Sequence, residues 1–271
     1  MKYLKGSDLV EYISERQSKQ VRSLIQSKNI QPKLVIINTN PDHLPSQKYL
    51  ELKKKRGEEL GIKVETYQID QSETPDLLKK LSDDDSVHGI ILQLPLSNPD
   101  QTEELINLIP PKKDVDGLTN NSLVEPATVG AILWLLAGFN IDLKNKKILI
   151  IGQGKLVGKP LTKLLNQQNI SVDTIDDSAS LDVLANKTSQ SDIIISAAGS
   201  PGLIKPEMLR NNQVIIDAGT SEIGGLIRGD IDEDIYKSEL DIIITPKIGG
   251  LGPLTISYLF ENLFLLIDKN S

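Results

Sequence analysis

Short apolar runs, each followed by a stretch with helical spacing, constrain this chain more than any other feature of its sequence. The runs read as buried strands and the amphipathic stretches as helices. Strands that alternate with helices form parallel sheets with right-handed crossovers, so the sequence predicts an α/β fold. The expected strands are 33–37, 63–69, 89–92, 147–151, 171–175, 192–196, 214–217 and 241–245, and the expected helices are 8–28, 46–60, 74–81, 101–109, 128–137, 158–168 and 256–268.

A loop at residues 110–119 interrupts this order, with the sequence PPKKDVDGLT. Prolines, charges and glycine in such density are typical of a domain junction. A chain of 271 residues is long enough for one large or two medium domains. We therefore expect an N-terminal α/β domain over 1–119 and a second α/β domain over 120–253, with a cleft between them.

Composition removes several classes of function. The net charge of −7 provides no basic field for nucleic acid. The chain has no cysteine, which excludes disulfides and thiolate sites, and its two histidines are too few for a histidine-based metal cluster. No apolar run follows the N-terminal charges, and no segment approaches the ~20 apolar residues of a membrane span. We expect a soluble, cytoplasmic protein without a metal site.

The stretch from Ser46 to Lys53 carries the first candidate chemistry. Ser46 is the predicted N-cap of its helix and Gly61 the predicted C-terminal stop. Tyr49 and Lys53 are four residues apart, so they share a face at the carboxyl end of a strand, where open α/β sheets bind ligands. Neighbouring cations and a partly dry cleft would disfavour the ammonium form of Lys53, which suits a general base. The competing interpretation is a solvated basic helix face.

A glycine-rich turn follows the strand at 147–151 and precedes a helix, with glycines at Gly152, Gly154 and Gly158. Such turns bind phosphates, because glycine lets the backbone approach the ligand and the helix N-terminus supplies amide donors. The spacing is one residue longer than the common fingerprint, and Asp176 ends the next strand, 24 residues after Gly152. A carboxylate there can bind both ribose hydroxyls of a dinucleotide. A solvated strand end is the alternative.

Taken together, the motifs of this chain resemble the FolD family, methylenetetrahydrofolate dehydrogenase/methenyltetrahydrofolate cyclohydrolase. Their order and spacing fit the family along nearly the whole chain. The matching segments are Ser-x-x-Tyr-x-x-x-Lys at Ser46, Tyr49 and Lys53, Gln-Leu-Pro-Leu at 93–96, Lys-Asp-Val-Asp-Gly at 113–117 and Gly-Gly-x-Gly-Pro-x-Thr at 249–255.

The resemblance implies a role for each matched residue. Lys53 is the general acid/base of the cyclohydrolase reaction, and Gln93 contacts it and tunes its protonation. Tyr49 packs on the pterin side of the substrate, and Asp116 holds the amino and ring nitrogens of the pterin. The loop at 249–255 lies by the cleft, where its substrate-side residues are Gly250, Pro253 and Thr255.

The resemblance also implies the activity and the assembly. The N-terminal domain binds folate, and the C-terminal helix, about 254–271, packs back on it. The second domain is a Rossmann-type NAD(P)-binding domain that uses the 152–158 turn and Thr220. The enzyme oxidises 5,10-methylenetetrahydrofolate to 5,10-methenyltetrahydrofolate with NADP or NAD and hydrolyses the product to 10-formyltetrahydrofolate. Family members are commonly homodimers.

The cofactor turn departs from the family pattern, which reads Gly-Arg-Ser-x-x-Val-Gly. Gln153 replaces the arginine and Gly154 the serine, and Asp176 and Asp177 stand where the family has a neutral or basic residue. These changes remove positive charge from the expected site of a 2′-phosphate and add negative charge. They predict a preference for NAD over NADP, or weak cofactor binding. Nearer the cleft, Ala127, Val129 and Ile248 replace family residues without removing a catalytic group.

Three alternatives stay open at this stage. A shikimate- or amino-acid-dehydrogenase-like enzyme shares the two-domain plan and uses a lysine, although the motifs at 113–117 and 249–255 argue against it. A non-catalytic folate- or nucleotide-binding relative would explain the altered cofactor turn. A cyclohydrolase with weak or lost dehydrogenase activity is the intermediate case.

Overall fold

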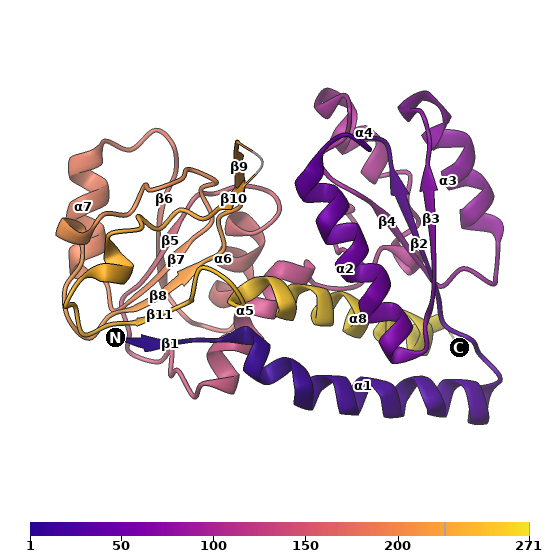
Figure 1. The fold of residues 1–271 in the computed structure, drawn as a ribbon, viewed down its shortest axis with the longest axis horizontal. Coiled ribbons are helices and arrows are strands. Elements are labelled where there is room, and N and C mark those ends of the chain that lie inside the picture. The colour runs from indigo at the N-terminus through magenta and orange to yellow at the C-terminus, as the bar shows by residue number, and fades with distance from the viewer. Residues whose placement is uncertain (225, 271) are drawn as a thin grey trace. The chain divides into compact units, whose positions relative to one another are not determined.

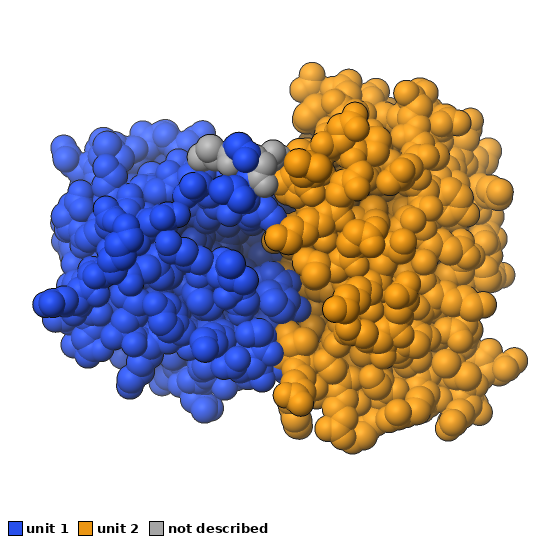
Figure 2. All heavy atoms as spheres, in the orientation of Figure 1, with its two compact units in different colours: residues 1–9, 128–254 blue, residues 10–127, 255–271 orange. Residues whose placement is uncertain are grey.

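The computed structural model describes residues 1–224 and 226–270, and the chain divides into two compact units (Figures 1 and 2). Unit 1 contains residues 1–9 and 128–254, and unit 2 contains residues 10–127 and 255–271. The expected division lay at 119/120 and placed the first nine residues with the N-terminal domain. The structure instead gives those residues to unit 1, because the strand at the N-terminus joins the sheet of that unit.

Unit 2 contains a three-stranded parallel sheet in the order β3-β2-β4. The central strand is buried on both faces, which explains its unbroken apolar run. The first two strands along the chain pair with each other, and the third adds on the opposite side of the first. The strands are β2 (Lys33–Asn38), β3 (Lys63–Gln68) and β4 (Gly89–Leu92).

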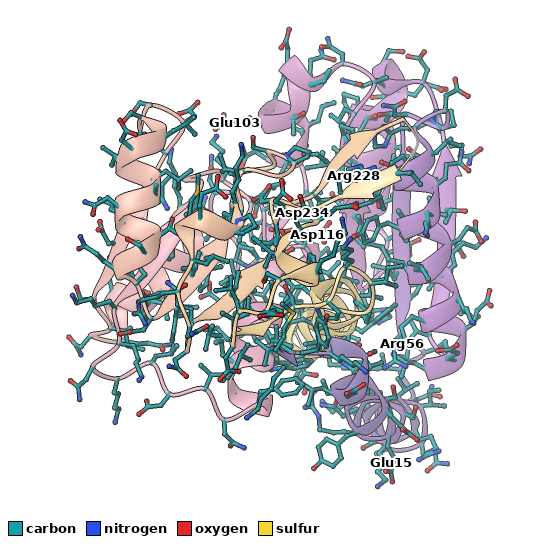
Figure 3. The ribbon with its side chains drawn as sticks, turned by 60° about the vertical axis from the view of Figure 1, so that its left-hand side comes forward. Glu15, Arg56, Glu103, Asp116, Arg228 and Asp234 are labelled. Carbon is teal, nitrogen blue, oxygen red and sulfur yellow. The ribbon has the colours of Figure 1, made fainter. Side chains whose placement is uncertain are left out.

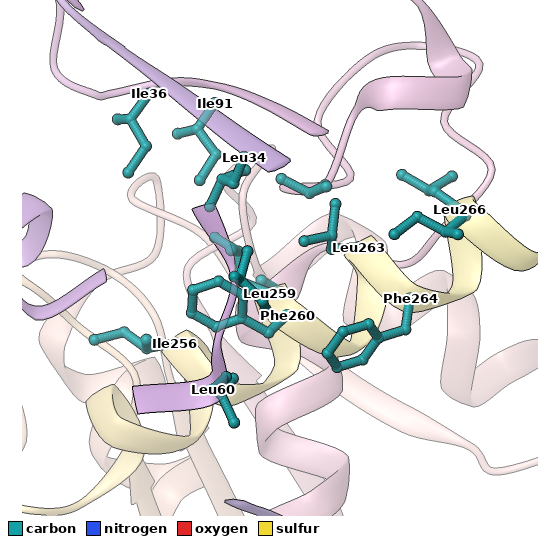
Figure 4. Packing of buried hydrophobic residues seen from close by; sticks show 14 of the residues in the cluster. Leu34, Ile36, Leu60, Ile91, Ile256, Leu259, Phe260, Leu263, Phe264 and Leu266 are labelled. Carbon is teal, nitrogen blue, oxygen red and sulfur yellow. The ribbon is translucent and has the colours of Figure 1, made fainter. Parts of the chain in front are cut away.

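Alternate side chains of β2 enter two different cores. Leu34 and Ile36 pack in a cluster with helices α1, α2 and α8 (Figure 4). Val35 and Ile37 pack on the other face with α3 and α4. Each fully buried leucine or isoleucine contributes about 1.5–3 kcal/mol. The helices are α1 (Gly6–Lys28), α2 (Leu44–Leu60), α3 (Thr74–Asp83), α4 (Thr102–Ile106) and α8 (Leu251–Asn270), with 3-10 turns at Gln71–Glu73, Pro99–Gln101 and Pro111–Lys113.

The ends of α2 test two sequence-based predictions. Gly61 caps the C-terminus with φ 81°, which confirms the predicted stop. The prediction that Ser46 caps the N-terminus is wrong, because the helix begins at Leu44 and the cap is His43. The His43 ring accepts a hydrogen bond from the Ser46 backbone N–H. This releases the Ser46 hydroxyl, which donates to the carbonyl of Leu94 at 2.9 Å.

Unit 1 contains a six-stranded, all-parallel sheet in the order β1-β11-β8-β7-β5-β6. The chain runs from β5 to β6 and then returns to the other side of β5 with β7. This reversal is the topological switch point at which doubly wound sheets bind ligands. The strands are β1 (Lys2–Tyr3), β5 (Ile148–Ile151), β6 (Val172–Ile175), β7 (Ile193–Ser196), β8 (Val214–Asp217) and β11 (Ile243–Ile244).

Several elements of unit 1 differ from the prediction. The elements not predicted from the sequence are β1, the helix α7 (Leu181–Gln190) and the two-stranded antiparallel sheet of β9 (Ser221–Ile223) and β10 (Leu226–Arg228). Helix α8 begins at Leu251 rather than at the predicted Ile256, so most of the expected 249–255 loop is helical. The remaining elements are α5 (Ala127–Gly138), α6 (Gly158–Gln167) and 3-10 turns at Pro206–Met208 and Ile235–Lys237.

Helix α8 also corrects the expectation about membrane spans. Within the described residues it is long and apolar enough to cross a membrane by length and composition alone. The protein itself buries 61% of that apolar window. Leu259, Phe260 and Leu263 are at most 1% exposed in the core of unit 2, so the hydropathy of α8 is that of a core helix.

Candidate active site

The candidate base Lys53 and Gln93 meet in unit 2, although 40 residues separate them along the chain. Lys53 lies on α2, and Gln93 directly follows β4. The Lys53 Nζ donates a hydrogen bond to the Gln93 Oε1 at 3.1 Å. Both side chains are less than 10% exposed, so the amine is held in a largely water-free setting. The competing interpretation of Lys53 as a solvated basic face is wrong.

The backbone after β4 fixes the orientation of the Gln93 amide. Its Nε2 donates to the carbonyl of Leu94 at 2.9 Å, which leaves the oxygen to face Lys53. The same carbonyl accepts the Ser46 hydroxyl, and the His43 ring lies 2.7 Å from that hydroxyl. The start of α2 and the end of β4 are thus joined through one carbonyl, which holds Lys53 and Gln93 in register.

Tyr49 lies one turn before Lys53 on the same face of α2, as the spacing predicts. It is half-buried and packs against the core cluster of unit 2. Burial raises the pKa of its phenol. The hydroxyl is therefore neutral at physiological pH and can donate a hydrogen bond.

Asp116, labelled in Figure 3, lies in the loop between the Pro111–Lys113 turn and α5. Its carboxyl is close enough to Lys53 to interact with it electrostatically. Burial raises the pKa of the Asp116 carboxyl, the charge on Lys53 opposes this rise, and the charge on Asp114 adds to it. The Lys53 amine therefore interacts with both the Gln93 amide and the Asp116 carboxyl in unit 2. Together they can bind a polar heterocycle and move a proton.

Two of the cations next to Lys53 in sequence form ion pairs with carboxylates on α2. Lys54 pairs with Glu51 at 4.0 Å, and Arg56 lies 3.6 Å from Glu59. These ion pairs partly neutralise both cations on α2 itself. Lys53 is buried, as a partly dry cleft requires, and its charge opposes the rise in the pKa of Asp116.

Three polar side chains fix the loop that carries Asp116 through hydrogen bonds, and none of these contacts was predicted from the sequence. Asp114 accepts hydrogen bonds from the backbone N–H groups of Gly117 and Thr119 at 3.0 and 2.9 Å. The Lys113 Nζ donates to three carbonyls at the end of α3 and the residues that follow. Asn262 of α8 donates to the carbonyl of Val115 at 2.9 Å. The motif at 113–117 therefore contains its own support for Asp116.

The glycine turn of unit 1 fits a dinucleotide at two of its three glycines. Gly152 has φ 88°, and a Cβ there would lie 2.4 Å from the Ala197 carbonyl oxygen. A Cβ on Gly158 would lie 1.8 Å from the Gly152 oxygen, so both positions require glycine. Gly154 has open space around it. Val157 provides no side-chain cap for α6, and in the first turn of that helix the Lys159 N–H already donates to the Gly154 carbonyl at 3.1 Å while Pro160 has no N–H, so the Gly158 N–H is the one this turn can offer to a phosphate.

The residues predicted to choose the cofactor gather around this turn. The Gly152 N–H donates to the carbonyl of Ile175 at 2.8 Å, which places the turn beside the end of β6 and Asp176. Asp176 and Asp177 are exposed. Hydrogen bonds from Ser178 lower the pKa of Asp176, so it is a carboxylate at neutral pH. Gln153 is partly buried and accepts a hydrogen bond from the Thr162 hydroxyl at 3.3 Å.

The other predicted residues lie at the ends of strands or at the start of α8. Thr220 is exposed in the loop after β8. Gly250 is buried just before α8, where its carbonyl oxygen would be 2.1 Å from a Cβ on Gly6. Pro253 and Thr255 belong to the first turns of α8. The structure thus groups Tyr49, Lys53, Gln93 and Asp116 in unit 2 and the cofactor candidates in unit 1.

Both parts of the chain match models of one protein family. The catalytic domain of tetrahydrofolate dehydrogenase/cyclohydrolase matches residues 4–116. The NAD(P)-binding domain of tetrahydrofolate dehydrogenase/cyclohydrolase matches residues 126–271. Together the two matches cover almost the whole chain.

Individual relatives agree with the family match. The bifunctional protein FolD of Lactobacillus acidophilus is 35% identical over 284 residues, which cover 100% of this chain and 98% of the relative. The crystal structure of the bifunctional FolD enzyme from Campylobacter jejuni has a TM-score of 0.87 and 32% identity, with 100% of both chains covered. The Trypanosoma brucei enzyme in complex with NADP and an inhibitor has a TM-score of 0.87 and 26% identity, covering 99% of this chain and 97% of that one.

Proposed function

This chain belongs to the tetrahydrofolate dehydrogenase/cyclohydrolase family, and we propose that Lys53 and Gln93 carry out its hydrolytic step. The chain is a bifunctional enzyme. It oxidises 5,10-methylenetetrahydrofolate to 5,10-methenyltetrahydrofolate with a nicotinamide cofactor and hydrolyses the methenyl compound to 10-formyltetrahydrofolate. The observation that carries the assignment of residues is the buried hydrogen bond between the Lys53 amine and the Gln93 amide.

Hydrolysis of the methenyl cation requires attack by water and the transfer of a proton. The Lys53 amine accepts a proton from the attacking water and passes it to the leaving ring nitrogen when the ring opens. Gln93 holds the amine in place through its oxygen. Asp116 binds the amino and ring nitrogens of the pterin, and Tyr49 packs beside the ring.

The substitution Lys53→Met tests this assignment, because it keeps the apolar stem and removes the amine. We expect hydrolysis of the methenyl compound to slow by at least about a hundredfold, the range of general acid–base catalysis. Lys55→Met is the matched control, since Lys55 lies on the same helix and is exposed. Hydrolysis at the wild-type rate in a folded Lys53→Met protein would show that another group is the base.

In the oxidation of the methylene compound, the main contribution of this chain is to orient the folate substrate relative to the nicotinamide. The lone pair of the substrate nitrogen N10 stabilises the cation as the hydride leaves. The nicotinamide, when bound, supplies the hydride acceptor. The residues proposed to hold the cofactor are Gly152, Gln153, Gly154, Gly158, Asp176, Asp177 and Thr220, and those proposed to lie on the substrate side of α8 are Gly250, Pro253 and Thr255.

We propose NAD as the preferred cofactor. Asp176 is ionised, exposed and next to the phosphate turn, so it accepts the ribose hydroxyls of NAD and repels the 2′-phosphate of NADP. Parallel assays should give a kcat/KM for NAD more than about tenfold above that for NADP. Asp176→Ser should reduce this ratio several-fold. Asp182→Ser, which removes an exposed carboxylate at the start of α7, should leave it unchanged. Equal use of both cofactors by the wild-type enzyme would contradict the charge argument.

Both parts of the chain match the tetrahydrofolate dehydrogenase/cyclohydrolase family, which favours the folate reaction over that of a shikimate- or amino-acid-dehydrogenase-like enzyme. The fit of Gly152 and Gly158 to a phosphate turn favours a working cofactor site over a non-catalytic relative. The proposal includes a cytoplasmic homodimer, as the family resemblance implies.

A further inference from the structure

Asp230 is a fully buried carboxylate in unit 1. It has no role in the sequence-based predictions or in the proposed mechanism. Its Oδ2 accepts hydrogen bonds from the Ser196 hydroxyl at 2.7 Å and from the Ala198 N–H at 2.8 Å. Its Oδ1 accepts one from the Ser200 N–H at 2.7 Å. All three donors lie at the end of β7 or just after it, so one side chain ties down the whole loop.

The loop that Asp230 holds forms the wall of the glycine turn. The backbone of Ala197 and Ala198 packs against Gly152, and a Cβ on Gly152 would lie only 2.4–2.7 Å from it. Gly152 follows β5 and the loop follows β7, and these two strands flank the switch point of the sheet. The shape of the loop therefore determines the shape of the crevice on the β7 side.

Asp230 also shapes the loop after β8. A Cβ on Gly219 would lie 2.2 Å from the Asp230 carboxyl carbon, so the backbone at Gly219 packs directly on the carboxylate. The Ser221 hydroxyl donates to the Gly199 carbonyl at 2.6 Å and joins the two loops. Asp217, at the end of β8, accepts the Asp230 N–H at 3.0 Å and thereby holds Asp230 itself.

A dinucleotide that crosses the switch point has its adenosine half at the end of β6 and its pyrophosphate at the Gly152 turn. Its other half must then extend along the loops after β7 and β8. We propose that Asp230 is a positioning residue for the nicotinamide half of the cofactor, because it holds both loops in the conformation that receives it. This inference deepens the proposed function and rests on it.

The substitution Asp230→Asn tests the inference with almost no change in volume. An amide turns one acceptor into a donor, which must face either the Ala198 or the Ser200 N–H and cannot bond it. We expect the KM for NAD to rise about tenfold, the effect of losing one hydrogen bond to a charged group. The KM for the folate substrate and the rate of hydrolysis of the methenyl compound should stay within about twofold, because hydrolysis requires no nicotinamide.

Asp192→Asn is the matched control. Asp192 accepts a hydrogen bond from the Lys147 N–H at 3.0 Å and one from Arg210 at 2.8 Å. It directly precedes β7, so it lies at the amino end of that strand, opposite to the end that Asp230 contacts. The substitution should leave the KM for NAD unchanged. If Asp230→Asn also leaves that KM unchanged, or lowers both activities equally, the residue is only structural and the inference is overturned.

A second variant covers the case in which Asp230→Asn does not fold. Gly219→Ala keeps the carboxylate and pushes a methyl group against it, so it too should raise the KM for NAD and spare hydrolysis. An unchanged KM in this variant would overturn the inference.

Titration of wild-type and variant proteins with NADH by fluorescence separates the two proposals. A wild-type enzyme that binds NADH without oxidising the folate would refute the proposed function, while the ratio of dissociation constants would still test Asp230.

Discussion

At the scale of the residue, Asp217 is a carboxylate whose protonation depends on how it is packed. Burial raises its pKa to about 6, and the charge of Asp230 adds to the rise, while N–H donors from Asp230, Ile231 and Gly219 oppose it. The pKa of Tyr236 is raised mainly by burial and further by the charge of Asp217. The side chain of Lys247 lies 5.1 Å from the centre of the Tyr236 ring.

The raised pKa of Asp217 predicts how stability changes with pH. Between 3.8 and about 6 the folded protein binds a proton on Asp217 that the unfolded chain has released. The stabilisation is complete below pH 3.8 and is lost as pH rises through 6, by at most about 3 kcal/mol. Asp217→Asn removes this titration, so the free energy of unfolding of the wild type minus that of the variant should fall from pH 4 to pH 7. Fluorescence of Trp134, which lies in unit 1, can follow the unfolding. A difference that does not vary with pH would contradict the assignment.

How far a residue can be predicted from sequence depends on where its partner lies. Lys53 was predicted because chemistry and spacing mark it, and the structure confirms its contact with Gln93. Asp230 and Asn262 were missed, because most of their partners are backbone groups 30 or more residues away. A backbone amide has the same chemistry at every position, so no sequence pattern identifies such a pair.

At the scale of the element, α8 supports the Asp116 loop through Asn262. The amide of this buried residue donates to the carbonyls of Val115 and Glu125, both at 2.9 Å. Asn262→Ala should lower the free energy of unfolding by about 2–4 kcal/mol, because one buried and one part-buried carbonyl lose their donor. Asn270→Ala removes an exposed bond to the Lys112 carbonyl from the same helix and should cost less than about 0.5 kcal/mol. Urea denaturation of both variants compares them, and equal losses would refute this role for Asn262.

The elements found from sequence are those with a strong periodic signal. β4 and β8 match their predicted bounds, since each is an apolar run between polar residues. Helix α7 was not predicted because its apolar residues do not all lie on one face. Leu181 and Val183 are exposed, so the sequence of this helix shows no continuous apolar stripe. Strand β1 has two residues and exists only through its pairing with β11, a contact more than 240 residues away along the chain.

At the scale of the whole molecule, each unit is built from two separate segments of chain. The N-terminal strand completes the sheet of unit 1, and the C-terminal helix fills the core of unit 2. Two domains were predicted from the loop at 110–119. The exchange of terminal segments was foreseen for the C-terminal helix through family resemblance and was missed for β1, whose two exposed residues have no apolar pattern.

The discontinuity of unit 2 has a consequence for protein production. A recombinant fragment that ends at residue 127 lacks Leu259, Phe260 and Leu263, so the apolar face of its sheet has no cover and the fragment will aggregate. A synthetic peptide with the sequence of residues 255–270 supplies that cover. The chain is therefore suited to split-protein complementation, in which the solubility of the fragment reports the docking of a single helix.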